Sequence, residues 1–287
     1  TQGRTTSQLI MSANKVIITA ADSKYFLCLV QFINSFLDSK EIDQSRLVIY
    51  NLGLTQQQID YINEKASLSK IELKHPKFDQ YPEFVAKNLK VYAWKPLLII
   101  EEINTEPGLY LWLDSAAIIL RPLDRIWQQI ASQGQYVPTA GSSSLDYYTH
   151  SETLRLLAVD DHIKTQLNRS GNLCGFSSQN KTTMDLLNEW KKLCLIPELI
   201  TPEGSNRSNH RWDQSILSIL LYKTASNNAL KLTADAVNIS SGYPISEISV
   251  RNIIRKKFPF FMMPIVKWYF LLERRIDVLI NRLKGIK

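Results

Sequence analysis

Cysteine and histidine, the residues from which zinc sites and disulfide frameworks are built, are scarce in this sequence. Three cysteines and four histidines are spread over 287 residues. Cysteines at such wide spacing fit neither a zinc site nor a set of disulfides, and the scattered histidines argue against a histidine-based metal cage. A reducing compartment is the expectation that follows.

A glycine-rich phosphate-binding loop is also absent. The first apolar run, residues 15–21, ends in small residues and is followed by Asp22 instead of a G-x-G-x-x-G fingerprint. A dinucleotide or S-adenosylmethionine site of that kind is therefore not indicated, which counts against a methyltransferase. The strongly apolar segment 258–272 is interrupted by Lys267 and two prolines, and it is shorter than the ~20 residues that a membrane-spanning helix needs.

Positive charge is concentrated at one end of the chain. Residues 251–287 hold ten basic and two acidic side chains, a net charge of +8, whereas the other 250 residues hold 24 basic and 25 acidic ones, a net charge of −1. A body without excess positive charge is not expected to bind nucleic acid. The tail combines basic and aromatic residues with an apolar stripe at helical spacing, which predicts an amphipathic helix on an anionic membrane surface; the alternative is a C-terminal helix folded onto the domain. We therefore expect a cytoplasmic protein that is peripheral on the inner face of a membrane.

Short apolar runs alternate with amphipathic stretches through the first half of the chain. This alternation predicts βαβ units and a mostly parallel sheet flanked by helices, in one α/β domain over residues 15–245 that precedes the tail 251–287. The expected strands are 15–21, 47–51, 71–73, 109–114, 135–138, 172–177 and 229–233. The expected helices are those capped by Asp22-Ser23 and by Thr55, and those over 82–103 (with a break near Lys95-Pro96), 123–131, 151–159, 161–167, 181–195 and 212–222.

Asp114 is the most informative residue of the chain. It stands between two apolar runs, at the end of the predicted strand 109–114. A buried charge costs several kcal/mol unless a metal, a cation or a set of donors compensates it. Because ligands bind at the carboxyl ends of strands in open α/β sheets, we interpret Asp114 as a ligand-binding carboxylate. The alternative is an aspartate that caps the next turn.

Three further segments contain candidate site residues. Asp22 follows the first strand, where it could accept a hydrogen bond from a nucleotide or cap a helix. Lys95 stands beside Trp94 at the expected helix break, and could hold a phosphate or lie on the surface. Gly175 lies in an extended segment, where glycine marks the close approach of a ligand or a bulge. Cys174 beside it is expected to be a buried, inert thiol.

The segment His210-Arg211-Trp212-Asp213-Gln214 is the second strong signal. Several hydrogen-bonding side chains come together at the start of a strongly apolar helix, where a carboxylate is favoured by the helix dipole. The preceding residues 202–210 predict a flexible loop that closes over a substrate. The alternative is a helix N-terminal box without a ligand.

Taken in order, these motifs resemble the nucleotide-sugar-dependent glycosyltransferases of the GT-A fold. The motifs are Thr19-Ala20-Ala21-Asp22, Tyr50-Asn51-Leu52-Gly53-Leu54, Tyr92-Ala93-Trp94-Lys95-Pro96, Leu111-Trp112-Leu113-Asp114, Asn172-Leu173-Cys174-Gly175-Phe176 and His210-Arg211-Trp212-Asp213-Gln214. The resemblance covers about residues 15–240 and is closest to a branch related to the family 8 enzymes. It implies transfer of a sugar, a hexose in the nearest relatives, from a nucleoside-diphosphate-sugar donor to a hydroxyl of a glycan, lipid-linked or protein acceptor.

The resemblance also implies a role for each candidate residue. Thr19, Ala20 and Asp22 would line the nucleotide pocket, Gly175 would lie by the donor sugar, and Asp213 and Gln214 would lie near the anomeric carbon. Asp114 matches the first position of the D-x-D motif that binds Mn²⁺ or Mg²⁺. The second carboxylate of that motif is replaced by Ala116. Two alternatives therefore stay open: the diphosphate is neutralised by Lys95 and Arg211 without a metal, or the protein binds nucleotide-sugar or glycan without turnover.

Overall fold

The computed structural model describes residues 13–67, 70–237 and 247–249. The predicted tail 251–287 lies outside these residues, so its helix and its membrane contact stay predictions. Within the described ranges, no helix is both long enough and apolar enough to cross a membrane.

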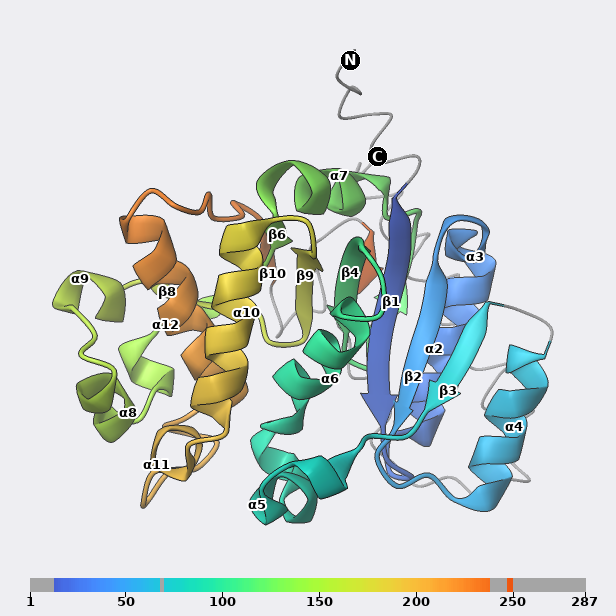
Figure 1. The fold of residues 1–287 in the computed structure, drawn as a ribbon, viewed down its shortest axis with the longest axis horizontal. Coiled ribbons are helices and arrows are strands. Elements are labelled where there is room, and N and C mark those ends of the chain that lie inside the picture. Colours follow the sequence, from blue (N-terminus) through green and yellow to red (C-terminus); the bar gives the residue numbers. More distant parts are fainter. Residues whose placement is uncertain (1–12, 68–69, 238–246, 250–287) are drawn as a thin grey trace.

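A six-stranded sheet forms the centre of the molecule, in the order β3-β2-β1-β4-β9-β6 (Figure 1). The first four strands run parallel, β9 is antiparallel to β4, and β6 is antiparallel to β9. The strands are β1 (Asn14–Ala21), β2 (Arg46–Asn51), β3 (Ile71–Lys74), β4 (Gly108–Leu113), β6 (Gln135–Tyr136) and β9 (Leu173–Ser177). The predicted α/β fold with a mostly parallel sheet is confirmed.

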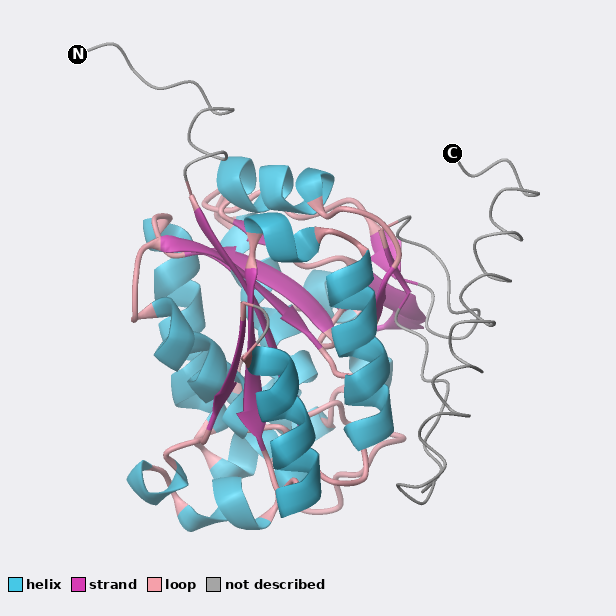
Figure 2. Ribbon diagram, turned by 90° about the vertical axis from the view of Figure 1, so that its right-hand side faces the viewer, coloured by secondary structure: helices cyan, strands magenta, loops and turns pink. Residues whose placement is uncertain are grey.

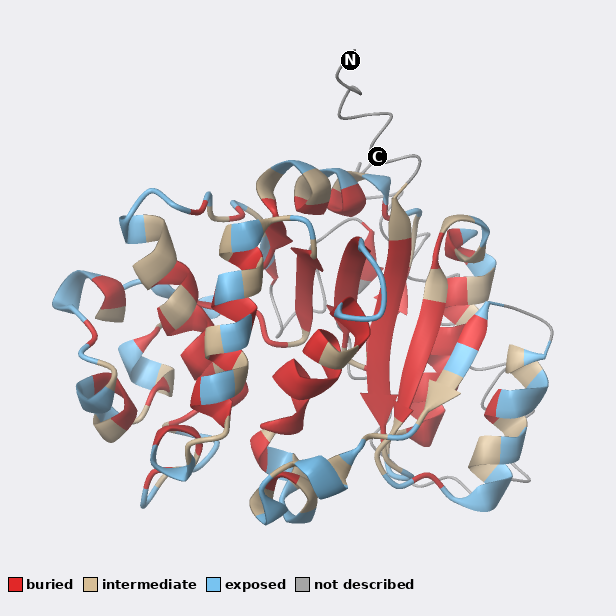
Figure 3. Ribbon diagram, in the orientation of Figure 1, coloured by how far each residue is buried: buried red, intermediate tan, exposed pale blue. Residues whose placement is uncertain are grey.

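Helices cover both faces of this sheet, so the central strands are buried on both sides (Figures 2 and 3). The longer helices are α2 (Phe26–Asp38), α4 (Gln56–Ala66), α6 (Trp94–Ile103), α7 (Asp124–Gln133), α10 (Lys181–Cys194) and α12 (Asp213–Ser226). The shorter ones are α3 (Glu41–Gln44), α5 (Glu83–Lys87), α8 (Ser151–Leu156), α9 (Asp161–Lys164) and α11 (Pro197–Ile200), with 3₁₀ turns η1 (Phe78–Gln80), η2 (Leu89–Val91) and η3 (Asp146–Tyr148).

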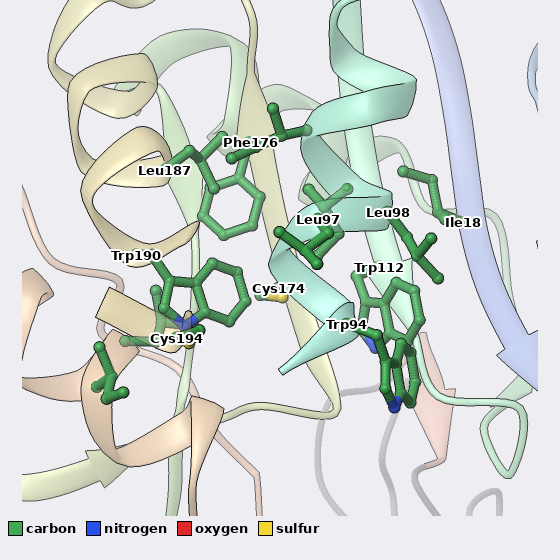
Figure 4. Close-up of a cluster of buried hydrophobic side chains, with 14 of the residues drawn as sticks. Ile18, Trp94, Leu97, Leu98, Trp112, Cys174, Phe176, Leu187, Trp190 and Cys194 are labelled. Carbon is green, nitrogen blue, oxygen red and sulfur yellow. The ribbon is translucent and has the colours of Figure 1, made fainter. Parts of the chain in front are cut away.

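The alternation of side chains along β4 divides the core into two clusters. Leu111 packs with α2 and α7 on one face, whereas Tyr110 and Trp112 pack with α6, α10 and α12 on the other. Figure 4 shows part of the second cluster, in which the indole rings of Trp94 and Trp112 lie next to each other, with centroids 5.8 Å apart. Even-numbered residues of β4 therefore face α6, and Asp114 continues that row just beyond the strand.

Among the described residues, five short strands lie outside the main sheet. They are β5 (Ile118–Ile119), β7 (Thr139–Ser144), β8 (Leu167–Arg169), β10 (Ala236–Val237) and β11 (Ile248–Ser249). β7 pairs with β8 and β10, and β5 pairs with β11. The strand predicted at 229–233 is wrong, because that segment is irregular and the strand begins only at Ala236.

Two predicted helix features are corrected by the structure. The helix expected over 82–103 is interrupted at 88–93 and not at Lys95-Pro96. Pro96 does not break the helix because it lies in the first turn of α6, where a missing backbone N–H costs no hydrogen bond. Asp22 does not cap α2; its Oδ1 accepts the backbone N–H groups of Lys24 and Tyr25 in the turn before the helix. The predicted cap at Thr55 is confirmed as a capping box with Gln58.

Candidate active site

A cavity of about 990 Å³ opens where β1 and β4 end and where α6 and α12 begin. Its volume is in the range of ligand sites in proteins. Seven of the nine predicted binding and catalytic residues line it: Ala20, Asp22, Lys95, Asp114, Arg211, Asp213 and Gln214. Residues from distant parts of the sequence therefore meet at the edge of the sheet where ligands bind in α/β proteins.

Lys95 lies at the centre of this group of residues. Its ammonium donates a hydrogen bond to the carbonyl of Gly171 at 2.7 Å. It also lies 3.3 Å from Asp114 Oδ1 and 3.5 Å from Asp213 Oδ2, and the side chain of Lys95 is only 4% exposed. Burial alone would lower the pKa of Lys95, but the charges of the two carboxylates outweigh burial and hold this pKa above its ordinary value. Lys95 is therefore a buried cation shared by two acids.

Aromatic rings enclose the same ammonium. It lies 5.1 Å from the ring centroid of Tyr92 and 5.3 Å from that of Trp112, within the range of cation–π attraction. Tyr92 adopts a left-handed backbone conformation (φ 55°) immediately before α6. This turn places Lys95 in the first turn of α6, where the helix dipole disfavours a cation and the two carboxylates compensate it.

Asp114 presents only part of its carboxylate to the cavity. Its Oδ1 accepts the indole N–H of Trp112 at 2.7 Å and also faces Lys95. Its backbone N–H donates to the carbonyl of Asn172, so the end of β4 is fixed to the start of β9. The side chain is 39% exposed, so part of it is accessible to solvent or a ligand.

Asp213 is the first residue of α12 and is almost completely buried. Trp190 donates its indole N–H to the backbone carbonyl of Asp213 at 2.9 Å, which fixes the start of the helix. Oδ2 of Asp213 has no hydrogen-bond partner among the described residues, although the ammonium of Lys95 lies near it. Burial raises the pKa of Asp213 to about 7, against the opposing effect of Lys95 and with a further rise from Asp114. Asp213 is thus a carboxyl group that can change protonation state near neutral pH.

The side chains of Gln214 and Arg211, near Asp213, are held by different kinds of contact. Gln214 donates its side-chain amide to the carbonyl of Arg169 at 2.7 Å. A Cβ on Gly171 would lie 2.9 Å from Cβ of Gln214, so a glycine is required at 171 for this approach. The guanidinium of Arg211 stacks over the ring of Tyr148 at 4.1 Å and forms no ion pair with any described acid. Arg211 is therefore a preoriented cation at the cavity.

Thr19 and Gly175 are the two predicted residues that do not line the cavity. Thr19 lies two residues before the end of the apolar run, fully buried within β1. Gly175 pairs with Leu111 in the sheet and faces α7, on the opposite side from Lys95. The close approach that requires a glycine at 175 is therefore to Ile130 of α7, whose Cδ1 would lie 2.4 Å from an added Cβ.

Gly175→Ala is expected to destabilise the protein by about 1–3 kcal/mol through overpacking against Ile130, and to leave the affinity of the cavity for any ligand unchanged. Urea denaturation and calorimetric titration with a nucleoside diphosphate measure the two effects. Ile130→Val, which removes the nearest carbon atom, should lower stability in the wild-type background but raise it in the Gly175→Ala background. A variant with full stability and weakened nucleotide binding would instead indicate that Gly175 lies by the donor sugar.

Several cavity residues were not predicted from the sequence. The rings of Tyr92 and Trp112 belong to motifs that the sequence does single out, but their positions around Lys95 depend on the strand register. Lys24, Lys90 and Arg207 also line the cavity. Each stands in a turn or loop, so nothing in the local pattern distinguishes it from an ordinary surface cation.

The predicted divalent metal does not fit the residues present. Asp114 is the only acid at the motif, because Ala116 stands where the second carboxylate would be, and one oxygen of Asp114 is already used by Trp112 and Lys95. No group of three or more His, Cys, Asp or Glu side chains with metal-binding geometry exists in the ranges that the structure covers. A buried ammonium between the two acids is unfavourable for a second cation.

The fold and the cavity define an α/β protein with a ligand-sized cavity at the carboxyl end of a mostly parallel sheet, the edge where ligands bind in this class. Residues 4–100 match the family DUF1647, described as a protein of unknown function. No curated protein matches the chain.

Solved structures identify the fold more closely. The bifunctional glycosyltransferase WbbM, solved in the apo form, matches with a TM-score of 0.50 and 10% identity over 78% of this chain, and this chain spans 39% of WbbM. The galactosyltransferase LgtC, solved with donor and acceptor sugar analogues, has a TM-score of 0.47 and 15% identity over 71% of this chain and 70% of LgtC. Core-mannan synthase A from Aspergillus fumigatus, in a Mn/GDP form, has a TM-score of 0.45 and 9% identity over 72% of this chain and 69% of the synthase. The chain has the GT-A fold of the nucleotide-sugar glycosyltransferases, as its motifs predicted.

Proposed function

We propose that this protein is a glycosyltransferase that moves a sugar from a nucleoside-diphosphate donor to an acceptor hydroxyl. The observation that carries the proposal is the cluster of the buried Lys95 and Asp213 with the partly exposed Asp114, in a cavity of about 990 Å³ at the carboxyl edge of a GT-A sheet. Charged groups held this close without solvent are costly unless they serve a ligand or a reaction.

The donor nucleotide is proposed to bind along the end of β1, beside Ala20 and Asp22, as the resemblance implies. Small side chains at the strand end let a nucleotide approach the backbone, and the Asp22 carboxylate can accept hydrogen bonds from a base or ribose. The diphosphate would then lie toward the centre of the cavity, near the cationic side chains. This placement directs the donor sugar to the first turn of α12.

Asp213 and Gln214 are proposed to act at the anomeric carbon. As a carboxylate, Asp213 can remove the proton of the acceptor hydroxyl or stabilise positive charge that develops on the sugar. Both roles require the deprotonated form. Gln214, held by the carbonyl of Arg169, can donate or accept hydrogen bonds to a sugar hydroxyl. The acceptor, a glycan, a lipid-linked glycan or a protein, is proposed to enter from the solvent side of the cavity.

Donor turnover tests this function. We expect one member of a panel of sugar nucleotides to release its nucleoside diphosphate in the presence of the protein, more rapidly with simple glycosides added as acceptors. Measurements in excess EDTA and in millimolar Mn²⁺ cover both cation conditions. Turnover by the wild-type protein and not by Asp213→Asn would support the proposal. Tight nucleotide binding without release or transfer from any donor would favour the non-catalytic binding protein instead.

A further inference from the structure

We propose that this protein binds the diphosphate of its donor with its own cationic side chains and requires no divalent metal ion. The inference rests on the proposed function, because it concerns how the donor of that reaction is held. Three features of the cavity support it. They are the position of Lys95 between two acids, the positive net charge of the cavity lining, and the location of the other basic side chains of the lining on different segments of the chain.

Lys95 already neutralises the carboxylate that a metal would use. Its ammonium donates a hydrogen bond to the carbonyl of Gly171 and forms ion pairs with Asp114 and Asp213, between which it lies. A divalent ion on the remaining oxygen of Asp114 would lie close to this ammonium and be repelled by it. Buried and paired with two acids in this way, Lys95 acts as a fixed internal counter-charge, and the direct contacts to phosphate fall to other side chains.

The cavity is cationic although the body of the protein is not. Its lining contains five basic residues and three acidic ones, whereas residues 1–250 as a whole carry a net charge of −1. The basic residues are Lys24, Lys90, Lys95, Arg207 and Arg211, and the acidic ones are Asp22, Asp114 and Asp213. A positive surplus in the lining of a cavity favours an anionic ligand there.

Four of the five cations are available to such a ligand. In the part of the chain that the structure describes, Lys24, Lys90, Arg207 and Arg211 form no salt bridge, unlike Lys95. They come from three segments: Lys24 from the turn after β1, Lys90 from the 3₁₀ turn η2, and both arginines from the loop that precedes α12. Cations on separate segments can contact a diphosphate from more than one direction, and the stacking of Arg211 on Tyr148 orients its planar fork in advance.

Calorimetric titration with UDP, GDP, ADP and CDP tests the inference on the full chain. We expect at least one of them to bind in excess EDTA, with a Kd that changes by less than about twofold when millimolar Mn²⁺ replaces the chelator. Because the contacts are ionic, the affinity should fall steeply with added salt. Binding that is absent in EDTA and restored by Mn²⁺, or strengthened more than about tenfold by it, would overturn the inference and leave the glycosyltransferase proposal intact.

Substitution of the cations provides an independent measurement. The double variant Arg207→Ala/Arg211→Ala should weaken nucleoside diphosphate binding in EDTA by at least about tenfold, which corresponds to about 1.4 kcal/mol. Lys231→Ala is the matched control, because Lys231 is exposed and lies outside the cavity lining. Equal affinities of the double variant and the control would overturn the role of the two arginines.

Ala116 allows the sharpest comparison. Ala116→Asp restores the second carboxylate of the motif, and we expect it to weaken binding in EDTA by about tenfold, since it adds a negative charge to the diphosphate site. Ala116→Asn has nearly the same shape without the charge, and should bind as the wild type does. Tighter binding by Ala116→Asp in EDTA would overturn the inference. Failure of the wild type to bind any of the four nucleoside diphosphates, with or without Mn²⁺, would overturn the proposed function itself.

Discussion

Replacing Asp213 by asparagine is expected to lower kcat by at least about 100-fold while leaving the Kd for nucleoside diphosphate within about threefold. The amide keeps the size of the side chain but cannot take a proton or carry the negative charge that either proposed role needs. The ion pair between Lys95 and Asp114 remains in the variant, so the cavity stays assembled. Donor turnover and calorimetric titration measure the two quantities.

The pH dependence of turnover distinguishes a reacting carboxyl group from a structural one. Because the pKa of Asp213 is about 7, the carboxylate fraction increases as the pH rises through neutrality, and kcat should increase with it along a single ionisation. In Asp213→Asn this increase of kcat with pH should be absent. Asp185→Asn, at an exposed position of α10 outside the cavity, is the matched control and should keep it. A profile that is unchanged in Asp213→Asn would contradict the assignment.

Replacing Lys95 by methionine is expected to lower the free energy of unfolding by about 3–5 kcal/mol near pH 8. The substitution removes the cation that two carboxyl groups share and leaves Asp213 buried without a counter-charge. At lower pH the loss should be smaller. Asp213 is a carboxyl group whose pKa in the folded protein lies above its unfolded value. Such a group contributes its full stability below the unfolded pKa, and this contribution is lost as the pH rises through the folded pKa. Urea denaturation at about pH 5 and pH 8 measures the difference.

A second substitution separates this charge effect from a packing effect. Lys95→Met/Asp213→Asn removes the cation together with one of its buried partners, and should recover more than about 1 kcal/mol of the stability lost near pH 8. Two outcomes would show that the buried ion cluster does not hold this site together. In the first, the losses in the free energy of unfolding caused by Lys95→Met and by Asp213→Asn simply add in the double variant. In the second, Lys95→Met is as stable as the wild type at both pH values.

The sequence predicted the part of the site that depends on where strands and helices end. Asp114 follows an apolar run and Asp213 begins an apolar helix, so each could be assigned to the functional edge of the sheet from local pattern alone. That both carboxylates share Lys95 could not be predicted, because the contact joins residues from β4, α6 and α12. It depends on which face of the sheet α6 covers.

Strand register explains the candidates that fell outside the cavity. Side chains alternate between the faces of a strand, so Gly175 and Cys174 lie on opposite sides of β9 although they are neighbours in the sequence. Only the pairing of Gly175 with Leu111 shows that it faces α7. The short strands β7, β8 and β10 were missed for a different reason: they are polar or only two or three residues long, and carry no clear alternation.

The placement of tryptophan in this fold has a practical consequence. Trp94, Trp112 and Trp212 line the cavity, whereas Trp127 and Trp190 are fully buried away from its lining. Indole emission responds to the polarity and charge around the ring, and an absorbing base nearby quenches it. A ligand that enters the cavity therefore changes the fluorescence of three indoles at once. The protein contains its own optical reporter, with which donors and acceptors can be screened without a label.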